Sequence, residues 1–343
     1  MLTSDFDYDL PSNLIAQTPL PVRDQSRMMV LERESGKIIH SRFKELLRYL
    51  NRGDVLVFNN TKVIPAKAWG KKGKDEIEFL FLKEREKGLW EVLSRPARKV
   101  KLGDRILFAP GFEGKVSGIE PEGKRVIQFS SSSILSKLKK IGYPPLPPYI
   151  KRKKDNTKLR ELDMDRYQTV FAQKEGAIAA PTAGLHFTLK IFEEIKKKGV
   201  ITTQISLDVG LATFKPVRGE RVEAHKMLDE NYSITPSAAR TINSAKKESK
   251  PVVAIGSTVV RSLESAFAEG KIQPGKQSTF LFIYPGYEFK VVDRLLTNFH
   301  LPKSTLLMMV AAFSSPKLIK KAYQEAIREK YRFFSYGDCM LIL

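Results

Sequence analysis

Two of the four histidines stand where an imidazole could take part in chemistry. His186 follows a turn-forming segment at residues 181–184, and His300 follows Phe299 in a segment that also contains Pro302. Because imidazole titrates near neutral pH, either side chain could act as a general acid or base or contact a heterocyclic ring. A buried histidine bonded to the backbone is the alternative for each. We take both as candidate catalytic residues, with His186 first.

Charged side chains in loop segments form a second group of candidates. Arg23, Asp24 and Arg27 lie on a loop shaped by prolines, where arginines can bind a carboxylate or a phosphate through paired hydrogen bonds. A solvated ion pair on a surface loop is the other interpretation. Arg261 lies near an expected helix start after Gly256, and helix starts attract anions.

Several common catalytic motifs are absent or incomplete. Gly270, Gly275 and Lys276 have the spacing of a phosphate-binding loop, but Gln277 replaces the Ser or Thr that holds magnesium, and a helix precedes the loop where a strand is required. No G-x-G-x-x-G follows a strand, and the histidines never approach the spacing of metal ligands. We therefore expect no nucleotide hydrolysis, no nicotinamide chemistry and no metal cofactor.

The composition predicts an intracellular protein with an anionic partner. Lys and Arg number 59 against 38 Asp and Glu, a formal net charge of +21, and such an excess attracts polyanions, nucleic acid first among them. High solubility alone is the alternative explanation. The basic runs at 151–154 and 196–198 fit solvated charge or, in a second interpretation, phosphate contacts. With a single cysteine, Cys339, no export signal and no long apolar run, we expect a soluble, cytoplasmic protein without membrane attachment.

The elements that must position these residues fall into two groups. Residues 54–66 read as two strands joined by a tight turn. Five short alternating runs follow between residues 76 and 129 and predict a small antiparallel barrel or sandwich. A helix near 132–141 and a stiff proline cluster at 144–148 end this segment. We therefore predict that residues 69–151 form a small β domain inserted into a larger one.

The rest of the sequence mixes helical and strand patterns and predicts a large mixed α/β domain made of residues 1–68 and 152–343. Apolar spacing and helix caps place the expected helices at 189–198, from Thr235, after Gly256, after Ser304 and over 316–330. The expected strands lie at 200–207, 252–255, 279–284 and 289–292.

Dense blocks of glycine, proline, histidine and charged residues remain that ordinary packing does not explain. They include QTPLPVRDQSR (17–27), GDVLVFNNTKVIPA (53–66), RYQTVF (166–171), AAPTAGLHFT (179–188), LDVGLATFKPV (207–217), IGSTVVRSLE (255–264), FIYPGY (282–287), LTNFHLPKSTLL (296–307) and YRFFSYGD (331–338). In order, over nearly the whole chain, these blocks closely resemble the S-adenosylmethionine:tRNA ribosyltransferase-isomerase family of the queuosine pathway.

The resemblance implies a large α/β domain with a smaller inserted antiparallel β-barrel, and it implies a reaction. The ribosyl part of S-adenosylmethionine, the co-substrate, would pass to 7-aminomethyl-7-deazaguanine in a tRNA anticodon, giving epoxyqueuosine, adenine and methionine. The sulfonium acidifies the neighbouring 5′ carbon, so that a side chain or the substrate amine can remove a proton there. The expected partners are S-adenosylmethionine and that tRNA, bound by a monomer.

Candidate residues follow from the positions that match the family blocks. The catalytic candidates are His186, Asp208 and His300. Asp208 would face the sulfonium, with a turn-stabilising carboxylate as the alternative. The substrate-binding candidates are Arg23, Asp24, Arg27, Thr182, Glu230, Arg261 and Tyr336. Of these, Arg261 would meet the methionine carboxylate or a phosphate, and Tyr336 is a stacking surface or a core residue.

Two residues depart from the family pattern, and two other functions remain as alternatives to the one that the resemblance implies. Leu228 stands where the family commonly has a second histidine, and Ala212 replaces a glycine. A non-catalytic RNA-binding module would account for the charge and the inserted β domain. An ordinary methyltransferase would need a glycine-rich loop from strand to helix, which this sequence lacks.

Overall fold

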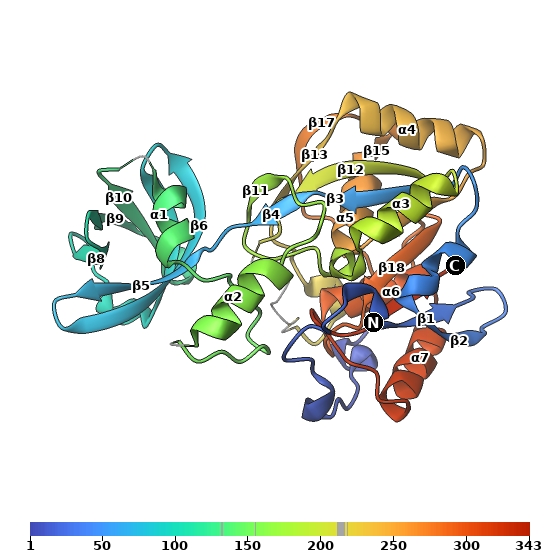
Figure 1. The fold of residues 1–343 in the computed structure, drawn as a ribbon, viewed down its shortest axis with the longest axis horizontal. Helices are drawn as coiled ribbons and strands as arrows, with labels where there is room; N and C mark the ends of the chain where they lie inside the picture. The colour runs from blue at the N-terminus through green and yellow to red at the C-terminus, as the bar shows by residue number, and fades with distance from the viewer. Residues whose placement is uncertain (132, 155, 211–216, 218) are drawn as a thin grey trace.

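A nine-stranded mixed sheet runs through the larger part of the molecule, and a closed barrel stands apart at one end (Figure 1). The computed structural model describes residues 1–131, 133–154, 156–210, 217 and 219–343. The strands of the large sheet are, along the chain, β1 Arg27–Leu31, β2 Ile38–Arg42, β3 Val55–Asn59, β12 Ile201–Leu207, β13 Glu230–Ile234, β14 Val252–Ile255, β17 Gly275–Thr279, β18 Arg294–Asn298 and β19 Cys339–Ile342. In space their order is β17, β13, β12, β3, β14, β18, β19, β1, β2.

The centre of this sheet is parallel and buried on both faces. Strands β12, β3, β14 and β18 run parallel to one another, and every residue of β3 and β14 is buried. Val55 and Val57 of β3 face one apolar cluster, whereas Leu56 and Phe58 face another, as strand alternation requires. A strand that is apolar on both faces is typical of a parallel sheet with helices on either side.

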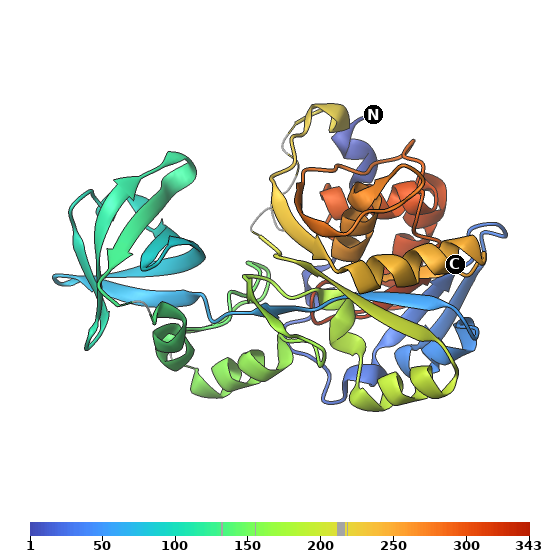
Figure 2. The same cartoon turned by 90° about the horizontal axis from the view of Figure 1, so that it is seen from above.

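The helices cover the two faces unequally. Viewed from above, α4 to α7 lie on one side of the sheet and α3 on the other (Figure 2). Their bounds are α2 Thr157–Arg166, α3 Leu189–Lys197, α4 Pro236–Lys247, α5 Ser257–Ala266, α6 Thr305–Phe313 and α7 Pro316–Arg328. The side chains of Thr188, Thr235, Ser304 and Ser315 each accept a backbone N–H at a helix start, which confirms the helices predicted at these places.

The smaller part is a closed antiparallel barrel whose spatial order is β10, β7, β6, β5, β8, β9. Its strands are β5 Lys67–Lys72, β6 Asp75–Glu86, β7 Leu89–Arg95, β8 Arg105–Ala109, β9 Phe112–Ile119 and β10 Lys124–Phe129, and helix α1 Ile134–Ile141 follows. The predicted fold, a large α/β part with an inserted antiparallel barrel, is confirmed. The division at residues 69–151 stays a prediction.

The sequence missed one barrel strand. Strand β5 has the sequence KAWGKK. Its three lysines and its small inward residues, Ala68 and Gly70, leave no clear alternation of apolar and polar residues. A Cβ atom on Gly70 would lie 2.5 Å from the side chain of Ile106, which shows how closely the barrel interior packs there.

Three other strand predictions were wrong. Residues 54–66 do not form a hairpin, because β3 pairs with β12 and β14 while β4 Thr61–Val63 pairs with β11 Lys174–Ala177. Residues 289–292 form no strand, and the strand expected at 279–284 is absent, because β17 ends at Thr279. The backbone of residues 290–292 is held by a side chain, since the carboxylate of Glu264 accepts hydrogen bonds from their three consecutive N–H groups.

The described helices include none that is both long enough and apolar enough to cross a membrane.

Candidate active site

A hollow lies where the parallel strands of the large sheet end. After β3 the chain returns to pair on one side of that strand as β12, and later on its other side as β14, so the strand order reverses at β3. Ligands of open α/β sheets bind at the carboxyl ends of strands beside such a reversal. The hollow is lined there by Val209 after β12, Gly256 after β14 and Asn298 at the end of β18.

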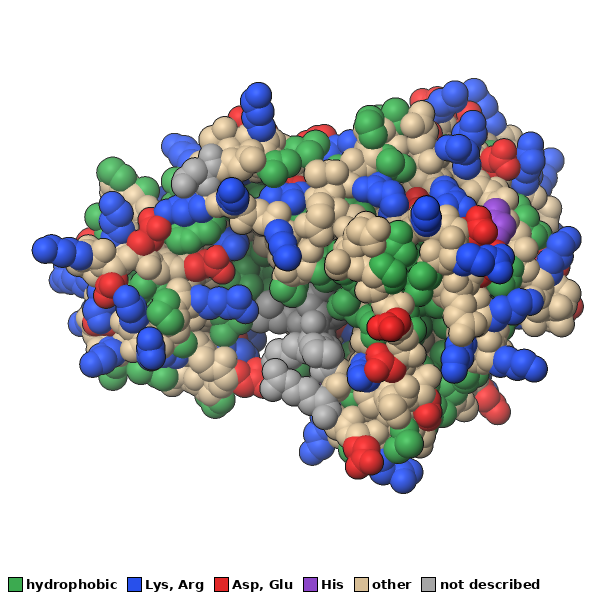
Figure 3. Space-filling view, turned by 90° about the horizontal axis from the view of Figure 1, so that it is seen from below, with side chains coloured by type: hydrophobic (Ala, Val, Ile, Leu, Met, Phe, Trp, Pro, Cys, Tyr) green, Lys and Arg blue, Asp and Glu red, His purple; other side chains and the backbone are tan. Residues whose placement is uncertain are grey.

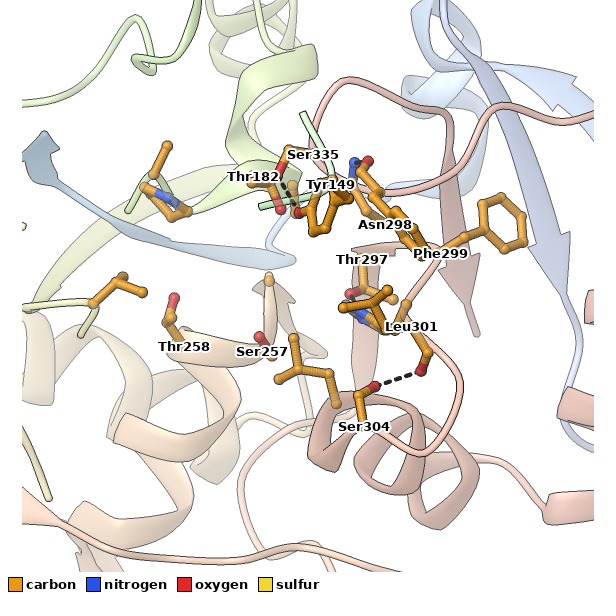
Figure 4. Close-up of a pocket in the computed structure, with 18 residues that line it drawn as sticks. Tyr149, Thr182, Ser257, Thr258, Thr297, Asn298, Phe299, Leu301, Ser304 and Ser335 are labelled. Atoms are coloured by element: carbon orange, nitrogen blue, oxygen red, sulfur yellow. Dashed lines mark hydrogen bonds between the residues drawn. The ribbon is translucent and has the colours of Figure 1, made fainter. Parts of the chain in front are cut away.

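The first turn of α5 forms one wall of this hollow. Gly256 precedes the helix with φ +93°, a backbone conformation that suits glycine, and a Cβ there would lie 3.5 Å from Ala183. Ser257 and Thr258 follow and line the hollow with their hydroxyls (Figure 4). The start of α6, with Ser304 as its cap, lies nearby and completes this wall.

The opposite wall comes from distant parts of the chain. The hydroxyls of Tyr149 and Ser335 are joined by a 2.7 Å hydrogen bond, and Thr182 lies beside them (Figure 4). Thr182, which the sequence analysis named as a substrate-binding candidate, therefore lines the hollow. Phe299 turns its ring away and is fully buried in the core.

His300 also lines this hollow and is held as a neutral imidazole. Its Nε2 lies 2.7 Å from the Thr297 hydroxyl, and its backbone N–H donates a 2.9 Å hydrogen bond to the Tyr323 hydroxyl. Burial lowers the pKa of His300 from 6.5 to about 3. At neutral pH the ring therefore carries no charge, and it is a weak proton acceptor.

His186 lies behind the hollow and is outside its described lining. Nδ1 lies 2.8 Å from the Ser26 hydroxyl, whereas Nε2 is buried without a hydrogen-bond partner among the described residues. Burial lowers the pKa of His186 to about 4; the nearby Asn298 amide opposes this shift, and the charges of Arg23 and Arg332 add to it. Asn298 Oδ1 has no other hydrogen-bond partner among the described residues, so the Asn298 amide and the His186 ring are polar groups that act on each other close to the wall of the hollow.

Asp208 follows β12 and lies beside the hollow, although only its neighbour Val209 is among the described lining residues. Its Oδ1 lies 3.5 Å from the Thr61 hydroxyl, and a Cβ on Gly176 would lie 3.5 Å from the same oxygen. The carboxylate therefore faces the short β4–β11 sheet at this point. A catalytic role for Asp208 stays a prediction.

Arg261 and Glu230 lie close together, and they form a buried ion pair with each other. The guanidinium of Arg261 bonds the carboxylate of Glu230, and it also donates to the carbonyls of Leu281 and Thr279. Glu230 in turn accepts the N–H of Gly210 at 3.2 Å. This buried pair ties α5 to β13, so its geometry supports a structural role, and substrate binding by either residue stays a prediction.

The predicted loop cluster at residues 23–27 is split. Arg23 donates to the carbonyls of Leu185 and Asp165, which places it beside the 3-10 helix Thr182–His186, whereas Asp24 accepts from the Thr188 hydroxyl. Arg27 points elsewhere. Its guanidinium lies 3.7 Å from the centre of the Tyr331 ring and donates to the Glu329 carbonyl. The three side chains therefore do not clamp one anion in this structure.

Tyr336 is buried and bonded rather than exposed for stacking. Its hydroxyl donates to Asp163 Oδ1 at 2.8 Å, and Arg152 holds the same carboxylate at 2.6 and 3.0 Å. Burial, and then the charge of Asp163, raise the pKa of Tyr336. Its proposed contact with substrate stays a prediction.

Seven polar residues that line the hollow were absent from the sequence-based candidates. They are Tyr149, Ser257, Thr258, Thr297, Asn298, Ser304 and Ser335. Six of them lie in the family-like blocks quoted above, and Ser257 and Thr258 come soon after a buried strand, which was the available signal. Ala212 lies outside the described residues, and Leu228 is exposed.

Comparison with known proteins gives a consistent result along the whole chain. A family model described as queuosine biosynthesis protein matches residues 3–342. The S-adenosylmethionine:tRNA ribosyltransferase-isomerase of Carboxydothermus hydrogenoformans is 49% identical over 346 residues, and that of Halothermothrix orenii 48% over 351, each covering 100% of both chains. The crystal structure of S-adenosylmethionine tRNA ribosyltransferase from Thermotoga maritima is similar, with 36% identity and a TM-score of 0.56 over 99% of this chain and 100% of that one.

Proposed function

This chain belongs to the S-adenosylmethionine:tRNA ribosyltransferase-isomerase family, and on that basis we propose the reaction that it catalyses and the site that it uses. The enzyme transfers and isomerises the ribosyl moiety of S-adenosylmethionine onto 7-aminomethyl-7-deazaguanine in tRNA. The products are epoxyqueuosine in the tRNA, adenine and methionine. The full-length similarity to relatives of this activity carries the proposal.

The hollow at the ends of β14 and β18 is the proposed site of this reaction. S-Adenosylmethionine carries a sulfonium, so a positively charged wall would repel it. The described lining instead offers the hydroxyls of Thr182, Ser257 and Thr258 and the neutral ring of His300. Hydroxyls and a neutral imidazole can bind ribose and adenine by hydrogen bonds without opposing the sulfonium.

The low pKa of His300 limits the chemistry that it can perform. A ring with a pKa of about 3 is a poor acceptor for the proton on the 5′ carbon, so we assign His300 to a hydrogen bond with adenine. The amine of the modified base is a stronger base and is the proposed proton acceptor. Asp208, beside the hollow, is the proposed carboxylate for the sulfonium.

The hollow must widen when the co-substrate binds. Its volume is about 60 Å³, whereas small-molecule sites usually measure about 300–1,000 Å³. We therefore propose that the segment carrying Tyr149 moves as one unit away from Ser257 on binding. We also propose that the enzyme acts as a monomer in the cytoplasm, where its tRNA substrate is found.

Adenine release tests the proposed function directly. Purified protein, S-adenosylmethionine and tRNA bearing 7-aminomethyl-7-deazaguanine should release adenine in proportion to epoxyqueuosine formed, as measured by liquid chromatography and mass spectrometry. Unmodified tRNA is the control and should give none. Formation of S-adenosylhomocysteine would indicate methyl transfer instead, and tRNA binding without any turnover would indicate a non-catalytic module.

A further inference from the structure

A second hollow lies between the barrel and the segment that leads from it to α2. One wall belongs to the barrel and includes Lys67, Trp69 and Arg95, and the other combines the proline-rich segment at 143–150 with residues 151–163. Its volume is about 610 Å³. In the view from below, Lys and Arg side chains border the space between the two parts of the molecule (Figure 3). We call this hollow the barrel groove.

The barrel groove carries a net positive charge. Its described lining contains seven cationic side chains and two carboxylates. Both carboxylates are engaged, Asp163 with Arg152 and Glu78 with Lys67, and Lys154 pairs with Glu76. The four remaining cations have no carboxylate partner in the described part of the chain: they are Arg95, Lys151, Lys153 and Arg160.

Three of the seven cations, Lys67, Lys154 and Arg160, are held in place by aromatic rings or backbone groups. The ammonium groups of Lys67 and Lys154 lie 5.1 and 5.2 Å from the centre of the Trp69 ring. Arg160 lies 5.0 Å from the centre of the Tyr143 ring and donates to the carbonyl of Gly142. Each contact of this kind stabilises the position of the cation by a modest free energy. Part of the positive charge in the groove is therefore in place before a ligand binds.

The barrel groove and the candidate active site share one wall. Within the segment at 144–150, Leu146 and Ile150 line the groove, whereas Tyr149 lines the candidate active site. Prolines at four of these positions restrict the backbone, so the wall is stiff. A chain molecule lying in the groove can therefore place one of its units on the other side of this wall.

From this arrangement we propose that the barrel groove binds the phosphodiester backbone of the tRNA anticodon stem-loop while the modified base enters the candidate active site. The inference rests on the proposed function, and it names the docking surface that this function requires. S-Adenosylmethionine has a net positive charge, so a groove whose described lining has seven cations and two carboxylates opposes it and favours a polyanion. Loop nucleotides of RNA are unstacked readily, which allows one base to leave the loop.

Charge reversal on one wall and neutralisation on the other test the inference. Lys151→Glu/Lys153→Glu changes two exposed cations of the connecting segment, and Arg95→Gln changes the barrel wall. The control is Lys320→Glu/Lys321→Glu on α7, which alters the net charge equally at two exposed positions far from the barrel. Binding of a labelled anticodon stem-loop is measured by fluorescence anisotropy without S-adenosylmethionine, at several salt concentrations.

We expect the Kd for the stem-loop to rise at least tenfold in Lys151→Glu/Lys153→Glu and about threefold in Arg95→Gln, with the control within twofold. Loss of two phosphate contacts should flatten the slope of log Kd against log salt by about 1.4 to 1.8. The KM for S-adenosylmethionine should stay within twofold. Equal effects in groove and control variants would overturn the inference, as would a raised KM for S-adenosylmethionine with unchanged stem-loop binding. Groove-dependent binding without adenine release by the wild type would refute the proposed function and leave the docking surface standing.

Discussion

The hydroxyl of Tyr336 donates a 2.8 Å hydrogen bond to the buried carboxylate of Asp163, which joins the C-terminal segment to α2. We expect Tyr336→Phe to lower the free energy of unfolding by about 1–3 kcal/mol, because one oxygen of a buried charged group loses a donor. Urea denaturation measures this change. The KM values for both substrates should stay within twofold. A raised KM with unchanged stability would instead show that the hydroxyl contacts substrate.

The buried pair of Arg261 and Glu230 leads to a second prediction. Glu230→Gln should lower the free energy of unfolding by about 3–5 kcal/mol, because the guanidinium of Arg261 then lies buried without its counter-charge. Thermal and chemical denaturation both report this loss. Glu223→Gln is the control, since Glu223 is 40% exposed, and it should cost less than about 1 kcal/mol. If Glu230→Gln keeps its stability and raises the KM for S-adenosylmethionine, the carboxylate binds substrate.

His300 should make the protein less stable in mild acid. Its pKa is about 3 in the folded protein and 6.5 in the unfolded chain, so below pH 6.5 protons bind the unfolded state preferentially. The contribution of this residue is complete above pH 6.5 and is lost by about 1.4 kcal/mol per pH unit as the pH falls towards 3. Unfolding free energies at pH 7.5 and 5.5 should therefore differ less in His300→Asn than in the wild type. An unchanged difference would show that the ring is not buried as a neutral group.

Gly256 should matter for turnover as well as for stability. Any other residue is strained at its φ of +93°, so Gly256→Ala should cost about 1–3 kcal/mol and shift the first turn of α5. We expect the rate of adenine release to fall at least tenfold, because Ser257 and Thr258 move with that turn. Gly270→Ala is the matched control, with φ +76° and no neighbouring atom within 4 Å of an added Cβ. It should lose some stability and keep its rate; similar rate losses in both variants would contradict the assignment.

Much of the fold could be predicted because local signals and packing agree. Helices α3, α4, α6 and α7 begin at Ser or Thr caps, and their apolar faces meet the sheet. Prediction failed where a distant group supplied the backbone partner. Residues 290–292 look like a strand but bond the carboxylate of Glu264, and β4 leaves β3 to pair with β11, more than 100 residues away.

The candidate site was only partly predictable from the sequence. Residue type and loop position made His186 and His300 candidates. They could not show that His300 lines the hollow, whereas His186 lies outside its described lining. Tyr149 and Ser335 are neutral and 186 positions apart, so nothing local suggests that their hydroxyls meet. The pairing of Arg261 with Glu230 likewise depends on the order of strands in the sheet.

The point where the chain enters and leaves the barrel has a consequence for how this enzyme can vary. Lys67 and Tyr143 exchange two backbone hydrogen bonds, of 3.1 and 2.7 Å, and a Cβ on Gly142 would lie only 2.1 Å from the carbonyl oxygen of Pro65. The two ends of the insertion are thus fastened side by side. Turns at the far end of the barrel can lengthen or shorten over evolution without disturbing the catalytic framework, and such changes would adjust how far the protein reaches along a bound nucleic acid.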